Sequence, residues 1–441
     1  MSFTQALPEI RVSPPGPRSR ELAARLAAVE SPAVDARREE RERASGLSHV
    51  PIVYERGEGP NVFDVDGNRY VDLAAGFGAL LLGHVPRRVA EALDVQERKI
   101  WLALGDVYAA EAKIHLCERL AARFPEPGAR VMLGASGADA VTAALKTAML
   151  ATGRAGVLAF EGGYHGLSHG PLAACGLRPS FREPFAAQLN AHVVFAPYPR
   201  DAASLGGTMA AARHALASGE IGAVLVEPIL GRGGCVVPPS AFLPLLSRAC
   251  AQSSALLVCD EIWTGLGRSG AWLASVEAGI VPDVVCLGKG LGGGLPISAC
   301  IGRASAMAAW GAHGGPTIHT ATHFGAPPAC AAALATLDAL ADGSLEARAR
   351  ELGPRWADRL RDKLRDCGVT EVRGRGLMIG VQLEGGAARA LSLVRRLLQQ
   401  GWIVLTGGAA GDVLTLTPPL DIEEPLLEAF TDTLAATARS P

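Results

Sequence analysis

The feature that most constrains the fold is a series of short, almost continuously apolar runs separated by stretches with helical character. Strands that are apolar on both faces are typical of a mostly parallel sheet with helices on each side. In such sheets, ligands bind at the carboxyl ends of the strands. We therefore expect an α/β fold. The seven candidate strands are 130–133, 156–160, 193–195, 223–226, 256–259, 284–286 and 297–300.

The composition indicates a globular chain with a large core. Hydrophobic residues make up 49% of the 441 residues and charged residues 20%, which excludes a disordered chain and allows two or three structural domains. Lys and Arg number 42 against 44 Asp and Glu, a formal net charge of -2. Nucleic acids and anionic membranes attract proteins with a basic excess or a basic face, so neither is expected as the main partner.

The cysteines and the N-terminal residues bear on the cellular location. The nine cysteines include no Cys-x-x-Cys pair, and several stand in apolar runs, which is typical of buried thiols in a reducing compartment. Residues 1–20 are rich in proline and lack the apolar core of a secretory signal, and no apolar run is long enough to span a membrane. We expect a cytoplasmic protein, and no metal site is indicated.

Changes in pattern along the chain predict three segments. Residues 1–75 form an N-terminal arm, with a charged helix over 20–43, followed by a β-hairpin over 62–72 that turns at Asp66-Gly67. Residues 76–335 form the large domain, and an Ala-rich helix over 329–341 leaves it. Residues 336–441 form a small α/β domain, to which the N-terminal segment also contributes.

Lys289 is the most informative single residue. It stands in a run of glycines and apolar residues, where its ammonium loses water, and desolvation favours an amine able to form an imine. The alternative is a structural or exposed lysine. Asp260, at the end of a predicted strand, favours the first reading, because an imine-forming lysine and a buried carboxylate are the groups that hold pyridoxal phosphate by opposite ends of its ring. Asp260 and Glu261 could instead form a salt bridge or cap a helix.

Two glycine-rich turns follow other predicted strands. Ser136 and Asp139 have the spacing of a capping box, so the helix after them begins with free N–H groups that suit a phosphate, or it is simply capped. Tyr164 lies among glycines and could stack on a flat ring or pack as an ordinary core residue. His165 is expected to be a structural hydrogen-bonding residue, because no nucleophile lies near it in the sequence.

With these motifs in order, the chain resembles the class III, fold-type-I pyridoxal-phosphate enzymes, which include the ω-amino acid, ornithine and 4-aminobutyrate aminotransferases. The resemblance extends over most of residues 50 to 435 and implies a large domain with a mostly parallel seven-stranded sheet. The matching motifs are 134–141, 160–166, 226–229, 260–270, 287–295, 319–325 and 417–420.

The resemblance also implies roles for individual residues. Lys289 would form the Schiff base with pyridoxal 5'-phosphate and then move the proton between the substrate Cα and the cofactor. Asp260 would bind the pyridine nitrogen, and the active form would be a homodimer with a shared active site. The other cofactor-binding residues implied are Tyr164 and Ile262 on the two ring faces, Glu227, the phosphate-binding Ser136, Gly137 and Ala138, and Thr322 from the neighbouring subunit.

Four positions depart from the family pattern or border the substrate. Thr415 stands where an arginine usually binds the substrate carboxylate, and Arg232 stands where a glutamate usually pairs with that arginine. Phe77 would make one wall of the substrate pocket apolar. Trp263 replaces a glutamine or methionine, so it either narrows the pocket or packs outward.

These features predict an aminotransferase that moves an amino group from an amine or amino acid to a 2-oxo acid. An amino acid racemase or epimerase of the same family is the alternative, since loss of the usual carboxylate clamp is compatible with it. A regulatory protein without activity is disfavoured, because Lys289 and Asp260 are intact and the N-terminal residues are too few for a DNA-binding head.

Overall fold

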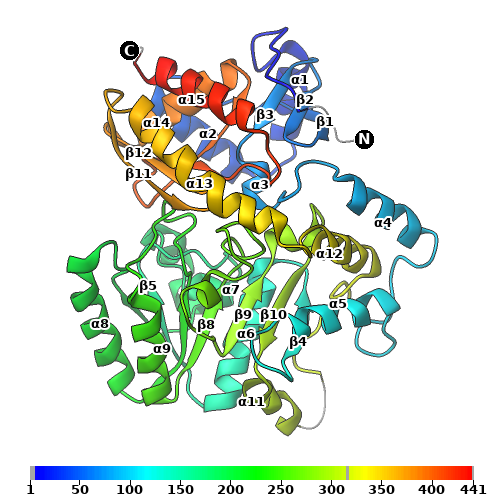
Figure 1. Cartoon of the computed structure of the whole chain (residues 1–441), viewed down its shortest axis with the longest axis vertical. Helices are drawn as coiled ribbons and strands as arrows, with labels where there is room; N and C mark the ends of the chain where they lie inside the picture. Colours follow the sequence, from blue (N-terminus) through cyan, green and yellow to red (C-terminus); the bar gives the residue numbers. More distant parts are fainter. Residues whose placement is uncertain (1–4, 314–316, 440–441) are drawn as a thin grey trace. The chain divides into compact units, whose positions relative to one another are not determined.

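The computed structural model describes residues 5–313 and 317–439. It divides into two compact units. One unit is the continuous segment Arg87–Ala347, and the other combines Met1–Pro86 with Arg348–Pro441. Figure 1 shows the course of the chain through both units.

A seven-stranded sheet forms the centre of the unit Arg87–Ala347, in the order β4-β10-β9-β8-β7-β5-β6. Strand β10 runs antiparallel to both of its neighbours, and the remaining pairs are parallel. All the strands expected from the apolar runs are present, so the predicted mostly parallel sheet is confirmed. The strands are β4 Arg130–Gly134, β5 Gly156–Phe160, β6 Val193–Ala196, β7 Ile221–Val226, β8 Leu256–Asp260, β9 Val284–Leu287 and β10 Ser298–Gly302.

Helices cover both faces of this sheet, which explains why its strands are apolar throughout. Alternate strand residues point to opposite faces. On one face Leu158 and Phe160 pack with α8 (Ala202–Ala217) and α9 (Phe242–Ser253), which lie side by side in Figure 1. On the other face Val157 and Ala159 pack against the alanines of α6, Gly137–Thr152.

The remaining elements of this unit surround the sheet. The predicted Ala-rich helix is α12, which begins at Pro327 and ends at Ala339, and it packs against α4 and α5. Proline at the first helical position fits because no intrahelical hydrogen bond is needed there. The elements are α4 Arg87–Glu97, α5 Glu111–Ala122, α7 His169–Ala173, η1 Pro179–Phe181, η2 Glu183–Gln188, α10 Ala274–Glu277, η3 Lys289–Gly292, α11 Ala304–Met307, η4 Ala308–His313 and α12 Pro327–Ala339.

The second unit is built from both ends of the chain around two four-stranded sheets. One has the order β1-β2-β3-β13, so a C-terminal strand pairs in parallel with an N-terminal one, and the other has the order β11-β12-β15-β14. The strands are β1 Tyr54–Glu58, β2 Asn61–Asp64, β3 Arg69–Asp72, β11 Val369–Arg375, β12 Met378–Leu383, β13 Trp402–Ile403, β14 Leu405–Gly407 and β15 Val413–Leu416. The helices are α1 Pro17–Ala27, α2 Pro32–Ser45, α3 Ala75–Gly78, α13 Ser344–Lys363, α14 Gly386–Gln399 and α15 Glu424–Arg439.

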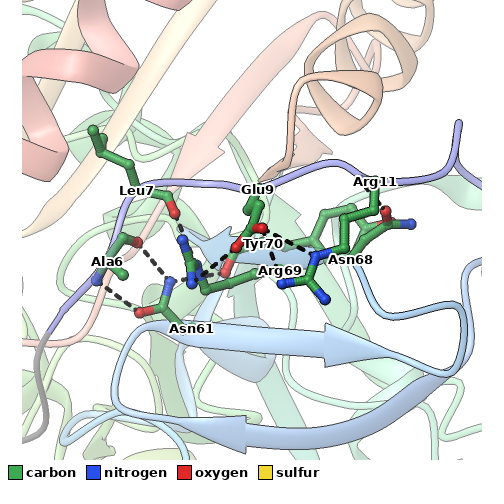
Figure 2. A network of polar contacts seen from close by, with 8 residues as sticks. All are labelled: Ala6, Leu7, Glu9, Arg11, Asn61, Asn68, Arg69 and Tyr70. Atoms are coloured by element: carbon green, nitrogen blue, oxygen red, sulfur yellow. Dashed lines mark hydrogen bonds and ion pairs between the residues drawn. The ribbon is translucent and has the colours of Figure 1, made fainter.

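The N-terminal arm is held to the β2–β3 hairpin by a polar network (Figure 2). Asn61 pairs with the backbone of Ala6, accepting from its N–H at 3.0 Å and donating to its carbonyl at 2.8 Å. Arg69 donates to the carbonyl of Leu7 at 2.9 Å, and its backbone exchanges two hydrogen bonds with Glu9. The arm thus lies along the hairpin as a further extended segment.

The predicted charged helix over 20–43 is wrong as a single element. Two helices form instead: α1 ends at Ala27, and α2 begins at Pro32 after Ser31, whose ψ of 129° is not helical. Among the helices of the described residues, none has the length and apolar character needed to cross a bilayer.

Candidate active site

The residues predicted to bind a cofactor gather at the carboxyl edge of the large sheet. Asp260 is the last residue of β8, Glu227 follows β7, and Lys289 comes two residues after the end of β9. Tyr164 lies in the loop after β5, and Ser136 lies in the turn between β4 and α6. Because β4, β5, β7, β8 and β9 all run in the same direction, their following loops meet at one edge.

Asp260 is buried, with 3% of its surface exposed, and a histidine neutralises part of its charge. The Nδ1 of His165 lies 2.8 Å from Oδ2 of Asp260, and the backbone N–H of Ile262 donates to Oδ1 at 3.1 Å. Burial alone lowers the pKa of His165, but the hydrogen bond and negative charge of Asp260 outweigh burial and raise the pKa above its ordinary value. The predicted hydrogen-bonding role of His165 therefore has a specific partner, and that partner is the predicted pyridine-binding carboxylate.

Glu227 joins two of the loops at this edge. Its Oε1 accepts from the N–H of Tyr164 at 2.7 Å, and its Oε2 accepts from the N–H of Gly231 at 2.9 Å. Burial raises the pKa of Glu227 to about 7, with the charge of His165 acting against that rise and the charge of Asp260 adding to it. The carboxylate thus fixes the backbone at Tyr164, in the loop after β5, and at Gly231, in the loop after β7.

Lys289 has a strained backbone and a partly desolvated amine. Its φ of +42° lies in the left-handed region, which a residue with a Cβ adopts at an energetic cost. Burial lowers the pKa of its amine to about 8; Glu227 and Asp260 act against this shift, while Arg232 and Arg268 add to it. An amine with this pKa is neutral in a useful fraction of molecules near neutral pH, as imine chemistry requires.

Trp263 points into this site and does not pack outward. The Nζ of Lys289 lies 3.9 Å from the centroid of the Trp263 ring, and the indole is 9% exposed. Only glycine fits beside it at position 231, because a Cβ there would lie 2.3 Å from Cε3 of Trp263. Within the described residues, the indole Nε1 is buried without a hydrogen-bond partner.

Arg232 stands on the same loop as Gly231 and reaches the predicted stacking residue. Its guanidinium carbon lies 4.5 Å from the centroid of the Tyr164 ring, a cation–π distance. Arg232 is half-buried. The site therefore contains a positive charge at the position where the resemblance led us to expect a glutamate.

The turn before α6 offers backbone donors. Ser136 caps the helix in a capping box with Asp139, whose carboxylate accepts from the N–H groups of Ala135 and Ser136. In the described part of the chain, no acceptor meets the N–H groups of Gly137 and Ala138. Ile262 closes one side of the turn, since a Cβ on Gly137 would lie 2.7 Å from its Cδ1.

Three predicted residues stand on other segments of the chain. Thr322 is exposed, in the segment between η4 and α12. Phe77 and Thr415 belong to the unit built from the two chain ends. Phe77 is 59% exposed with a φ of +60°, and Thr415 is buried on β15 with its hydroxyl unpartnered in the described residues.

Comparisons with known proteins identify the family. The model of the family described as aminotransferase class-III matches residues 43–437. Acetylornithine aminotransferase of Mycolicibacterium smegmatis is 39% identical over 386 residues, which cover 88% of this chain and 93% of that protein. The acetylornithine aminotransferase of Methanothermobacter thermautotrophicus is 34% identical over 385 residues, covering 87% of this chain and 93% of that protein.

Solved structures agree with this result. The amine transaminase from an uncultivated Pseudomonas species, in its PLP-bound form, matches with a TM-score of 0.81 at 29% identity, covering 88% of this chain and 94% of that one. The ornithine aminotransferase of Toxoplasma gondii matches with a TM-score of 0.79 at 29% identity, covering 93% of this chain and 98% of that one.

The sheet, the lysine and the buried carboxylate define a pyridoxal-phosphate enzyme of fold type I. The chain belongs to the class III aminotransferase family. The predicted family, fold and enzyme class are thereby confirmed. The racemase or epimerase alternative receives no support from these comparisons.

Proposed function

We propose that this aminotransferase takes an amino group from a donor that carries a carboxylate and passes it to a 2-oxo acid, with Lys289 as the cofactor-binding lysine. The observation that carries the proposal is the Lys289 amine at the sheet edge where Asp260 and Glu227 are buried, with its pKa lowered to about 8. Such a combination of burial and charge is typical of catalytic groups.

The residues present fit pyridoxal 5'-phosphate. The N–H groups of Gly137 and Ala138, which no described residue accepts from, suit its phosphate at the N-terminus of α6 together with the Ser136 hydroxyl. The Asp260 carboxylate suits its protonated ring nitrogen, and Ile262 and one face of Tyr164 suit its ring. When bound, the cofactor supplies an electron sink that stabilises negative charge at the substrate Cα.

The chain's own side chains hold and move the protons. Lys289 Nζ would hold the cofactor and, when free, would carry a proton to and from the substrate Cα. His165 donates from Nδ1 to Asp260, which fixes the orientation of the buried Asp260 carboxylate. Glu227 holds the loops of Tyr164 and Gly231 in place.

Arg232 supports a donor with a carboxylate. Its guanidinium lies over Tyr164, close enough to Lys289 for its charge to lower the pKa of that amine. A substrate carboxylate would neutralise Arg232, and charge-assisted hydrogen bonds of this kind are strong. Acetylornithine, which the names of the curated relatives give as their substrate, carries such a carboxylate and is the first donor to test.

A half-reaction tests the transfer itself. The full-length enzyme is loaded with pyridoxal phosphate and mixed with a single donor in the absence of any oxo acid. We expect loss of the visible absorption of the loaded enzyme with release of one oxo product, and Lys289→Ala should show no such change. An unchanged spectrum with every amine of a broad panel would contradict an aminotransferase function.

Kinetics test the role of Arg232. In Arg232→Gln, we expect KM for a carboxylate donor to rise by about 10- to 100-fold with little change in kcat, since a charge-assisted hydrogen bond contributes about 1.5–3 kcal/mol. A carboxylate-free amine serves as the matched control, because its KM should not change. A KM that rises equally for both donors would show that Arg232 acts only on the structure of the site.

We propose further that two copies of the chain form a homodimer with a shared site. Large exposed apolar patches on a protein mark contact surfaces, and one stretch before and into α5 is rich in exposed apolar side chains. Thr322 is also exposed, as a residue that reaches a partner's phosphate must be in the isolated chain. The exposed residues are Ile100, Trp101, Leu102, Leu104, Val107, Tyr108 and Ile114.

Sedimentation tests the homodimer. The double variant Leu104→Lys with Tyr108→Lys should sediment as a monomer and bind the cofactor more weakly, and Thr322→Ala should weaken cofactor binding while the protein stays dimeric. A double variant that sediments like the parent protein would contradict this surface as the interface.

We also propose a cytoplasmic location. All nine cysteines are free thiols, as is typical of proteins in a reducing compartment.

A further inference from the structure

Lys289 has an unusual neighbour for a partly desolvated amine. Its Nζ lies 3.9 Å from the centroid of the Trp263 ring, and no ion pair of Lys289 with a described residue accompanies this contact. Tryptophan is the aromatic residue that attracts a cation most strongly. The ring therefore takes the place of a counter-ion.

The nearby carboxylates are engaged with other groups. Asp260 accepts from His165 and from the N–H of Ile262. Glu227 accepts from the N–H groups of Tyr164 and Gly231. Both act on Lys289 through their charge, but neither forms a hydrogen bond to its amine among the described contacts.

The position of the indole is fixed by the loop beneath it. A Cβ on Gly231 would lie 2.3 Å from Cε3 and 3.1 Å from Cδ2 of Trp263, so the ring and the loop backbone are in close contact. Glu227 anchors that backbone at Gly231. The ring thus presents a preorganised surface to the end of the Lys289 side chain.

We propose that Trp263 is a positioning residue for Lys289, whose ammonium it holds by a cation–π contact whenever the amine is not joined to the cofactor. The inference rests on the proposed function only in taking Lys289 as the cofactor-binding lysine. The amine is free in the cofactor-free protein, and it would be free again whenever a substrate amine takes its place on the cofactor. In both states the ring keeps the amine inside the site.

The ring also acts on the charge of the amine. Burial, Arg232 and Arg268 favour the neutral form of Lys289, whereas Glu227 and Asp260 favour the charged form. The negative face of the indole also favours the charged form of the Lys289 amine. Removing the ring should therefore lower the pKa of the free amine.

Chemical labelling tests the inference. Full-length, cofactor-free protein is exposed briefly to acetic anhydride over a range of pH, and the acetylation of Lys289 is measured by mass spectrometry, with Lys363 as the internal control. For Trp263→Leu we expect the labelling midpoint of Lys289 to fall by about 0.5–1 pH unit, from the usual size of a cation–π contact. Trp263→Phe retains a ring and should shift the midpoint by less than half as much.

A matched variant and a second measurement separate the outcomes. Trp272→Leu removes an indole that contacts Arg123 and should leave the Lys289 midpoint unchanged. A midpoint that is unchanged or rises in Trp263→Leu would overturn the inference. Borohydride reduction of the loaded enzyme then shows whether the cofactor is attached at Lys289; attachment elsewhere would overturn the proposed function and leave the labelling result as it stands.

Discussion

Lys289 occupies its position at a cost to the stability of the chain. Its backbone is held at a φ of +42°, and its ammonium is moved from water into the site. Strain of this kind persists only where the surrounding structure enforces it. A residue such as methionine would keep the left-handed backbone but remove the desolvated charge, so replacing Lys289 in this way should stabilise the cofactor-free protein.

We predict that Lys289→Met raises the free energy of unfolding of the cofactor-free protein at pH 7 by about 1–3 kcal/mol. The pKa of Lys289 falls from 10.5 to about 8 on folding, so the folded state binds fewer protons than the unfolded state between these values. The parent protein therefore gains stability as pH rises from about 8 to 10.5, and the advantage of Lys289→Met should shrink over that range. Urea unfolding at pH 7 and pH 10 measures the difference in free energy of unfolding between Lys289→Met and the parent protein. A difference that is the same at both pH values would contradict the prediction.

Glu227 gives a second prediction at the residue scale. In Glu227→Gln, the amide group places a donor opposite the N–H of Tyr164 or Gly231, where the carboxylate accepts from both. Leaving a buried N–H unsatisfied costs about 1–3 kcal/mol. We expect urea unfolding to show that loss and hydrogen exchange at Tyr164 or Gly231 to accelerate; unchanged exchange at both amides would contradict it.

The sequence allowed some of these residues to be predicted and concealed others. Lys289 and Asp260 follow apolar runs, and the ends of parallel strands meet, so their proximity could be expected. The contact of His165 with Asp260 joins residues 95 positions apart and depends on which strands are neighbours. The inward direction of Trp263 depends on the close approach of Gly231, which no local pattern reports.

At the scale of elements, strand positions were more predictable than strand directions. Every strand of the large sheet could be located from its apolar run, because burial on both faces requires such runs. The placement of β10 between β4 and β9 and its antiparallel direction could not be predicted, since an apolar run is the same in either direction. Pro32 indicates that a helix begins within residues 20–43, because proline is common at the first helical position. The charged helical pattern on both sides of Pro32 nevertheless favours a single helix.

The contact between the loop after β7 and Trp263 gives a prediction for elements. Gly231→Ala should reduce the free energy of unfolding by about 1–3 kcal/mol, because the new methyl group overlaps the indole. In a protein that already carries Trp263→Leu, the same substitution should reduce the free energy of unfolding much less. Gly206→Ala on α8, where nothing lies within 4 Å of the added carbon, is the matched control and should not destabilise the protein. Equal costs for Gly231→Ala in both backgrounds would contradict the contact.

At the scale of the whole molecule, cofactor binding should be linked to stability. A ligand that binds only the folded protein stabilises it by about 2.7 kcal/mol at 100 times its Kd. We expect pyridoxal phosphate to raise Tm clearly for the parent protein and much less for Lys289→Ala at the same concentration. Differential scanning calorimetry measures both, and equal increases would indicate that Lys289 does not bind the cofactor.

The pairing of β3 with β13 has a consequence for how the chain is made. Strand β3 ends at Asp72, and its parallel partner starts at Trp402, so the ribosome completes the whole unit Arg87–Ala347 between them. At about 5–20 residues per second, this interval lasts roughly a quarter of a minute to a minute. During translation, the edge of β3 that pairs with β13 therefore stays unpaired for this interval. The continuous unit can fold first, while the N-terminal strands are still accessible to chaperones.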